Sequence, residues 1–185
     1  MKLEGIQPAT DGVEVRLSRI LNNKDSRELA GVKFEIIHKF SADKVVTTAK
    51  VTNLLHDAIE IAFRFHNMPA ILGKKGNETG MIQFASGETF RRDFDQKMIR
   101  VSPIDPLLEK AFNIVQQKRT AQKLPVRLSA PWSKSALEVS FPAAPQSIVV
   151  WDDVRQTCPT FEPVYKRTQI VPGKSAEFVM SAAVK

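Results

Sequence analysis

A single cysteine, Cys158, occurs among the 185 residues of this chain, so no disulfide can form within it. Long apolar runs are also missing: no stretch approaches the roughly 20 apolar residues that span a bilayer, and we expect no membrane partner. The first residues, MKLEGIQPATDG, lack the apolar core of a signal peptide, but neither this nor the lone cysteine defines a cellular compartment. The length predicts one domain over residues 1–185.

Metal-binding and nucleophile motifs are lacking too. The three histidines, His38, His56 and His66, form no HxH or HExxH pattern, and the lone cysteine excludes a CxxC pair. No GxSxG sequence marks a nucleophile elbow. We therefore expect no metal site and no cofactor.

Positive charge is present but is not concentrated. The formal net charge is +7 and the isoelectric point is about 9.6, which raises nucleic acid as a candidate partner. The basic residues are scattered, however, and their densest clusters are pairs such as Lys74-Lys75 and Arg91-Arg92. No RRM, KH or zinc-finger pattern accompanies them, so we expect no specific nucleic-acid partner.

What the chain does have is a period of two. Apolar and polar residues alternate in GVEVRLS (12–18), in GVKFEIIHKF (31–40) and most clearly in IEIAFRFH (59–66). In the last segment we expect Phe63 and Phe65 to be buried together, while Arg64 and His66 face a cleft or solvent. Strict alternation of this kind predicts half-buried antiparallel strands.

Many short strands, separated by turn residues, complete the pattern and predict an all-β, two-sheet antiparallel β-sandwich. One segment departs from it: IDPLLEKAFNIVQQKR has helical periodicity after Asp105 and Pro106, and predicts a connecting helix over about 106–119. Further strands are expected at 45–52, 79–85, 88–94, 97–101, 125–130, 136–141, 147–151, 161–165, 168–171 and 176–182.

Two separate stretches resemble galactose mutarotase-like (aldose 1-epimerase-like) proteins. In KVVTTAKVTNLLHDAIEIAFRFHNMP, Asn53 and His66 match an asparagine and a histidine that end successive strands in that family. In CPTFEPVYKRTQIVPGKSAEFVMSAAV, Glu162 matches the catalytic glutamate, and Pro172 and Gly173 match the last turn. The resemblance covers about residues 30–70 and 145–185.

This resemblance implies a supersandwich fold that binds carbohydrate. In active epimerases a histidine donates a proton to the sugar ring oxygen and a glutamate takes one from the C1 hydroxyl, so the two groups act on opposite sides of the anomeric centre. By the resemblance His66 and Glu162 are the candidate catalytic pair and Asn53 is a ligand-binding candidate. Arg64 is a further ligand-binding candidate, because strand alternation places it on the same face as His66. The chain departs from the family in being shorter and in reading HNMPAIL after the histidine. Beside the resemblance, the shorter length favours a domain excised from or truncated relative to a longer protein.

Ordinary structural roles are open for the same residues. His66 could pair with Glu60 or a backbone group, and Glu162 could be a strand-edge carboxylate. Strand alternation around Phe161 predicts that Glu162 faces outward, and Pro163 favours an edge position because it donates no hydrogen bond.

Three function hypotheses follow. The first is a carbohydrate-recognition or structural module of a carbohydrate-active protein, such as an accessory domain associated with a glycoside hydrolase; its expected partners are carbohydrate and other domains of the parent chain. It needs an exposed aromatic platform, for which the candidates are Trp132, Trp151 and Tyr165. The second is an aldose 1-epimerase, although we lean against an enzyme for the isolated domain. The third is a protein-interaction sandwich, which needs an exposed apolar patch.

Overall fold

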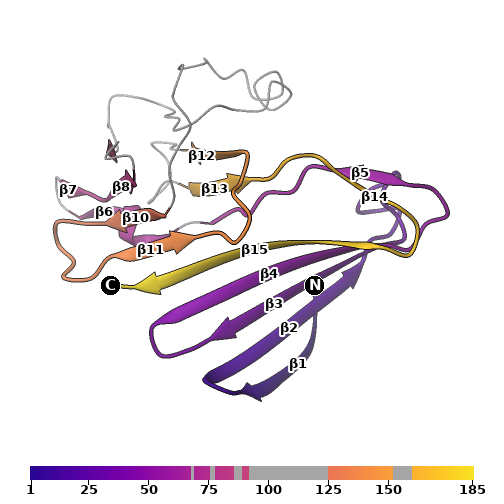
Figure 1. The fold of residues 1–185 in the computed structure, drawn as a ribbon, viewed down its shortest axis with the longest axis horizontal. Coiled ribbons are helices and arrows are strands. Elements are labelled where there is room, and N and C mark those ends of the chain that lie inside the picture. Colours follow the sequence, from indigo (N-terminus) through magenta and orange to yellow (C-terminus); the bar gives the residue numbers. More distant parts are fainter. Residues whose placement is uncertain (68, 76–77, 86–88, 92–124, 152–159) are drawn as a thin grey trace. The chain divides into compact units, whose positions relative to one another are not determined.

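The computed structural model describes residues 1–67, 69–75, 78–85, 89–91, 125–151 and 160–185 (Figure 1). These residues form an all-β structure of antiparallel sheets, which confirms the predicted β-sandwich class. The expected helix over 106–119 and the expected strand over 97–101 lie outside the described residues. The chain divides into two compact units: unit 1 comprises residues 1–62 and 167–183, and unit 2 comprises 63–166 with 184–185.

Unit 1 is built on long antiparallel strands that neighbour each other in the order β1-β2-β3-β4-β15 (Figure 1). A short antiparallel pair, β5 with β14, completes it. The strands are β1 (Lys2–Ala9), β2 (Gly12–Ile20), β3 (Val32–Phe40), β4 (Lys44–Asn53), β5 (Ile59–Ile61), β14 (Thr168–Ile170) and β15 (Ser175–Val184). All except β1 overlap segments that the sequence predicted as strands.

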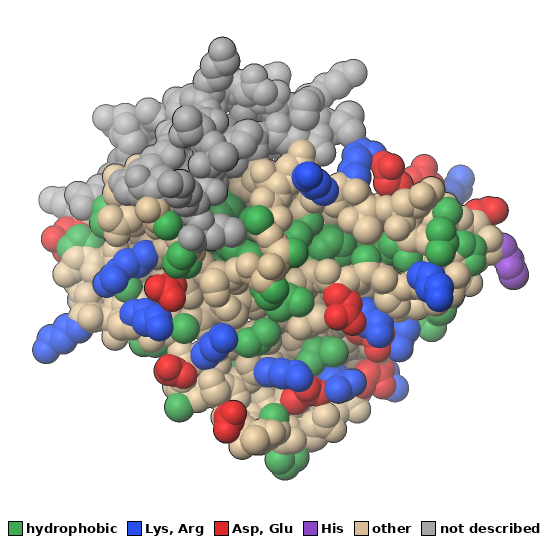
Figure 2. Space-filling view, viewed as in Figure 1, with side chains coloured by type: hydrophobic (Ala, Val, Ile, Leu, Met, Phe, Trp, Pro, Cys, Tyr) green, Lys and Arg blue, Asp and Glu red, His purple; other side chains and the backbone are tan. Residues whose placement is uncertain are grey.

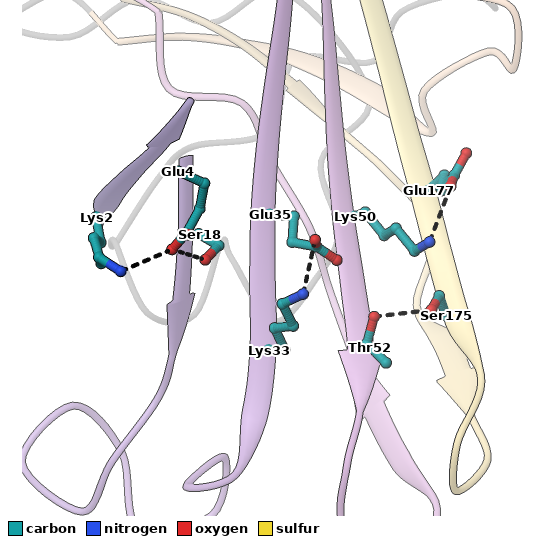
Figure 3. A network of polar contacts seen from close by, with 9 residues as sticks. All are labelled: Lys2, Glu4, Ser18, Lys33, Glu35, Lys50, Thr52, Ser175 and Glu177. Atoms are coloured by element: carbon teal, nitrogen blue, oxygen red, sulfur yellow. Dashed lines mark hydrogen bonds and ion pairs between the residues drawn. The ribbon is translucent and has the colours of Figure 1, made fainter. Parts of the chain in front are cut away.

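The period-two pattern gives this sheet two different faces. On one face Val32, Ala49, Val51 and Phe178 are buried. The opposite face carries polar pairs: Figure 3 shows lysines, glutamates and hydroxyl side chains that contact one another along and across the strands. In Figure 2 basic and acidic side chains intermingle over the part of the view where Figure 1 draws β1–β4. Exposed pairs of this kind contribute little stability, about 0–1 kcal/mol each.

The β1–β2 turn depends on a glycine. A Cβ atom at Gly12 would overlap with the backbone carbonyl oxygen of Phe40 on the adjacent strand, whereas a Cβ atom at Gly5, in the same hairpin, would meet nothing within 4 Å. The close approach of the two backbones at Gly12 therefore requires a residue without a side chain.

We predict that Gly12→Ala lowers the free energy of unfolding by about 1–2 kcal/mol, because the strand must shift to admit the methyl group. Gly5→Ala, the matched control, should leave it nearly unchanged. Urea denaturation followed by circular dichroism measures both. Equal effects of the two substitutions would contradict the predicted overlap.

The last turn matches the expectation from the sequence. Lys174 N donates to Val171 O over 3.1 Å, and Gly173 between them has a φ of 71°. Pro172 supplies the fixed φ of the first central position, and glycine supplies the positive φ of the second. Strand β15 begins directly after this turn.

Unit 2 consists of shorter strands. β8, β9, β10 and β11 neighbour each other in the order β11-β10-β8-β9, and β12 pairs with β13. Its elements are the 3-10 helix η1 (Ala70–Leu72) and strands β6 (Lys74–Lys75), β7 (Glu78–Thr79), β8 (Met81–Phe84), β9 (Thr89–Arg91), β10 (Val126–Ser129), β11 (Leu137–Ser140), β12 (Ser147–Trp151) and β13 (Thr160–Val164). Its buried apolar residues include Phe65, Leu72, Ile82, Phe84, Val126, Leu128, Ile148 and Phe161.

Candidate functional site

Three extended segments of unit 2 frame the predicted catalytic pair. Strand β13 pairs along one edge with β12, with Glu162 opposite Val149. Along its other edge, isolated bridges join Val164 to Arg64 and Phe161 to Asn67. These two bridges set an antiparallel register in which His66 lies opposite Glu162. The segment from Phe63 to Asn67 thus reaches β13 from almost 100 positions earlier in the chain.

Pro163 does not lie on an edge strand, as the sequence had favoured, because β13 has β12 along one side and residues 63–67 along the other. Its carbonyl oxygen accepts a hydrogen bond from Phe65 N over 3.2 Å, but its own nitrogen has no hydrogen to return. The flanking contacts are made by Tyr165 N, which donates to Phe63 O over 2.9 Å, and by Phe161 N, which donates to Asn67 O over 2.8 Å.

Strand alternation sorts the side chains of this frame into two groups. Phe65 and Tyr165 are buried, and Phe63 is half-buried; the Phe63 and Phe65 rings meet edge to face with centroids 5.0 Å apart. Arg64 and His66 point to the other side and are exposed. The predicted separation of the two phenylalanines from Arg64 and His66 is confirmed.

Glu162 is the centre of the polar group. Its carboxylate lies 2.8 Å from Arg64 Nη1 through Oε2 and 2.9 Å from His66 Nδ1 through Oε1. Oε1 also accepts a hydrogen bond from Thr160 Oγ1 over 2.7 Å. Glu162 is only 2% exposed, whereas the side chains of Arg64 and His66 are 39% and 56% exposed. The cluster is therefore a buried carboxylate beneath two solvent-accessible nitrogenous side chains.

The prediction that Glu162 faces outward is wrong. The carboxylate does project from the side opposite Phe161, as alternation requires, but Arg64 and His66 from the neighbouring segment lie over it. The alternative pairing of His66 with Glu60 is wrong as well. Glu60 instead pairs with Arg167 over 2.6 Å within unit 1.

Thr160 was not identified from the sequence. It stands two residues before Glu162 on the same strand and therefore shares its face. The spacing of a hydroxyl residue and a glutamate at positions i and i+2 of a strand is the signal that would have indicated it.

Asn53 has a local structural role in unit 1. It is completely buried, and its amide nitrogen donates to the carbonyl oxygens of Asp57 and Ile170, each over 2.8 Å. Its amide oxygen accepts from Leu55 N over 2.9 Å. Both amide hydrogens are thus used by backbone carbonyl groups, one in the turn after β4 and one on β14, which leaves none for a ligand.

The three aromatic candidates differ in accessibility. Trp132 is half-buried in the loop between β10 and β11, and Trp151 ends β12, where the structure describes the backbone but not the ring. Tyr165 is only 6% exposed, since its ring packs against Phe63 and Phe65 with centroid distances of 6.4 and 6.1 Å. The expectation that Tyr165 belongs to an exposed platform is wrong.

Burial raises the pKa of Tyr165 to about 12, because desolvation penalises the phenolate. The unfolded value is about 10, so the stability contributed by the neutral phenol is complete below about pH 10 and is lost as the pH rises toward 12. Tyr165 is the only tyrosine in the chain, so an alkaline absorbance titration reads it alone. We expect a midpoint well above 10 in the folded protein and near 10 in urea; a folded midpoint near 10 would contradict the burial of this ring.

The described residues offer no alternative centre for metal chemistry. No group of three or more histidine, cysteine, aspartate or glutamate side chains within them is arranged to hold a metal ion. Nor does that part of the chain contain a helix long and apolar enough to cross a membrane.

A cavity of about 280 Å³ lies in unit 1 beside the β1–β2 and β3–β4 turns, and none of the predicted site residues lines it.

Solved structures share this fold. A galactose mutarotase-like protein from Clostridium acetobutylicum matches all of the chain with a TM-score of 0.65 at 11% identity, and a galactose mutarotase related enzyme from Lactobacillus acidophilus matches all of it with 0.64 at 10%. An alpha-galactosidase from Lactobacillus brevis also matches the whole chain, with a TM-score of 0.55 at 12% identity. These likenesses establish the galactose mutarotase-like fold that the sequence motifs predicted.

The lengths differ. The chain spans about two thirds of the two mutarotase-like structures, 66% and 70%, and 25% of the alpha-galactosidase. No family model matches the sequence, and no curated protein does.

Proposed function

We propose that this chain, which has the galactose mutarotase-like fold, is a carbohydrate-recognition or structural module of a larger carbohydrate-active protein and does not carry out aldose epimerisation. Structures with this fold are described as a galactose mutarotase-like protein and a galactose mutarotase related enzyme, which supports carbohydrate as the ligand class. The fold also forms a quarter of an alpha-galactosidase, which supports a module beside other domains.

The observation that carries the proposal is the direct contact between His66 Nδ1 and Glu162 Oε1 at 2.9 Å. Epimerisation needs an acid and a base on opposite sides of the anomeric centre, each within hydrogen-bond reach of the sugar. Side chains in direct contact with each other leave no space for a sugar ring between them. Arg64 and Thr160 also contact the carboxylate, so a sugar hydroxyl could reach it only by displacing one of these partners.

Sugar binding does not require an acid and a base on opposite sides of the anomeric centre. The exposed parts of Arg64 and His66 offer polar nitrogen atoms at the surface, and sugar hydroxyls both donate and accept hydrogen bonds. Because the Tyr165 ring is buried, the remaining aromatic candidates for stacking on a sugar face are Trp132 and Trp151.

A protein-interaction module is the second candidate. One observation favours it: apolar side chains on β1, β2 and β3 are exposed in unit 1, namely Leu3 (52%), Ile6 (65%), Val13 (41%) and Phe40 (46%). They share one face of the sheet by register, with Val13 opposite Phe40 and Ile6 opposite the half-buried Val15. Contiguous exposed apolar surface is characteristic of protein contacts.

The proposal is tested by titrating a panel of simple aldoses and short oligosaccharides into the 15N-labelled protein and following the backbone amide signals. We expect saturable shifts around residues 64–67 and 160–165 that weaken in Arg64→Ala. The matched control is Arg167→Ala, which removes an exposed arginine paired with Glu60 and should leave the affinity unchanged. If no sugar of the panel binds, the second candidate replaces the first.

A further inference from the structure

We propose that Glu162 is a positioning residue rather than a group that touches the ligand: it holds neutral His66 in the Nδ1–H tautomer, so that His66 Nε2 is presented as a hydrogen-bond acceptor for a ligand hydroxyl. The proposal rests on the proposed function only for the identity of the ligand as a sugar. The tautomer itself follows from the geometry of unit 2.

The first step is the accessibility of the two side chains. Glu162 is 2% exposed and both of its oxygens are in contact with neighbouring side chains, whereas the His66 side chain is 56% exposed. A ligand arriving from solvent meets the imidazole before the carboxylate. Glu162 can therefore influence a ligand only through the groups that lie over it.

The second step is the direction of the hydrogen bonds. An ionised carboxylate only accepts, so Thr160 Oγ1 donates to Oε1. His66 Nδ1 lies 2.9 Å from the same oxygen, and at that distance a protonated nitrogen is attracted to the carboxylate whereas a lone pair is repelled. The Arg64 guanidinium pairs with the other carboxylate oxygen, Oε2, over 2.8 Å. With the proton on Nδ1, the other ring nitrogen of a neutral imidazole carries the free lone pair.

The third step concerns what Nε2 can bind. It lies on the edge of the ring away from Glu162, and within the described part of the chain the only ion pair or hydrogen bond of the His66 side chain is the one with the carboxylate. An exposed lone pair takes a hydrogen-bond donor, and an alcoholic hydroxyl is the donor that a carbohydrate supplies.

The tautomer is measured directly by two-bond 1H–15N correlation of the imidazole nitrogens, at a pH where their shifts show neutral rings. Only three histidines contribute, and His66→Asn identifies the signals of His66. His38 is an internal reference, because its Nδ1 contacts the Thr47 hydroxyl over 3.0 Å rather than a carboxylate. We expect His66 to have its proton on Nδ1; a proton on Nε2 in the wild-type protein overturns the proposal.

Glu162→Gln tests the role of the carboxylate. The amide oxygen should turn toward the charged Arg64, which places the amide NH2 against His66 Nδ1 and switches the imidazole to the Nε2–H tautomer. Thr160→Val is the matched control, since it removes another contact of Oε1 but leaves the carboxylate in place, and it should keep the Nδ1–H tautomer. Retention of the wild-type tautomer in a folded Glu162→Gln variant contradicts the positioning role.

The consequence for binding is measured with the same variants and a sugar that binds the wild type. We expect Glu162→Gln and His66→Asn each to weaken binding about threefold to tenfold, the effect of one hydrogen bond, and Thr160→Val to have a smaller effect. If the tautomer is as predicted but no sugar binds, the proposed function fails and the positioning of His66 stands. If sugar binds with the proton on Nε2, the positioning inference fails and the proposed function stands.

Discussion

Replacing Phe161 with alanine is expected to lower the free energy of unfolding by about 3–5 kcal/mol, because it leaves a cavity in the core of unit 2. The ring is only 1% exposed and lies at the start of β13, beside the bridge to Asn67. Phe63→Ala should lower the free energy of unfolding by less, because the Phe63 ring is only half-buried. Urea denaturation followed by tryptophan fluorescence suits this measurement, because both tryptophans, Trp132 and Trp151, belong to unit 2.

Phe40→Ala is the matched control, since it removes the same side chain from a position in unit 1 that is 46% exposed. The unfolding of this variant is measured by circular dichroism. We expect its free energy of unfolding to fall by no more than about 1 kcal/mol. Similar losses for Phe161 and Phe40 would show that β13 is not a core strand of unit 2. The frame that brings Glu162 to His66 would then be wrong as well.

Arg64→Ala should lower the free energy of unfolding by about 2–3 kcal/mol. Removing one partner of a buried ion pair typically costs about 3–5 kcal/mol, because the other charge remains buried without compensation. Here the guanidinium is 39% exposed, so water can partly replace it, and His66 and Thr160 still contact the carboxylate. Both features reduce the expected loss.

Arg167→Ala provides the comparison for this prediction as well. Arg167 lies 2.6 Å from Glu60, but the two side chains are 48% and 56% exposed, and such pairs contribute about 0–1 kcal/mol. The difference between the two variants therefore isolates the burial of Glu162, which is only 2% exposed. A loss for Arg64→Ala no larger than that for Arg167→Ala would contradict a buried, charged Glu162.

The strands that sequence predicted best are those with the cleanest alternation. β2, β3 and β4 each carry apolar residues at every second position over at least part of their length. The pattern arises because one face of the sheet is buried and requires apolar side chains. Strand β1 was missed because KLEGIQPA contains Gly5 and Pro8, and because a bulge between Leu3 and Gly5 breaks its period. Every residue of β1 is exposed, so no buried face imposed a pattern on its sequence.

The candidate site could be predicted only in part, for a different reason. His66 and Glu162 were identified as a pair from their resemblance to family motifs, and alternation correctly separated Arg64 and His66 from the phenylalanines. The burial of Glu162 could not be foreseen, because it depends on a bridge between segments that are almost 100 residues apart in sequence. Alternation on one strand specifies which face a side chain takes, but not what covers that face.

The measurement that tests the central claim most directly follows sugar binding and anomer exchange in one sample. NMR exchange spectroscopy on a saturating aldose reports the rate of interconversion between its α and β anomers, while the amide signals of the protein report binding. A carbohydrate-recognition module should bind saturably and leave the exchange rate equal to that of sugar with buffer alone. Exchange accelerated by the wild type and abolished in both Glu162→Gln and His66→Asn would contradict the claim and identify the chain as an epimerase.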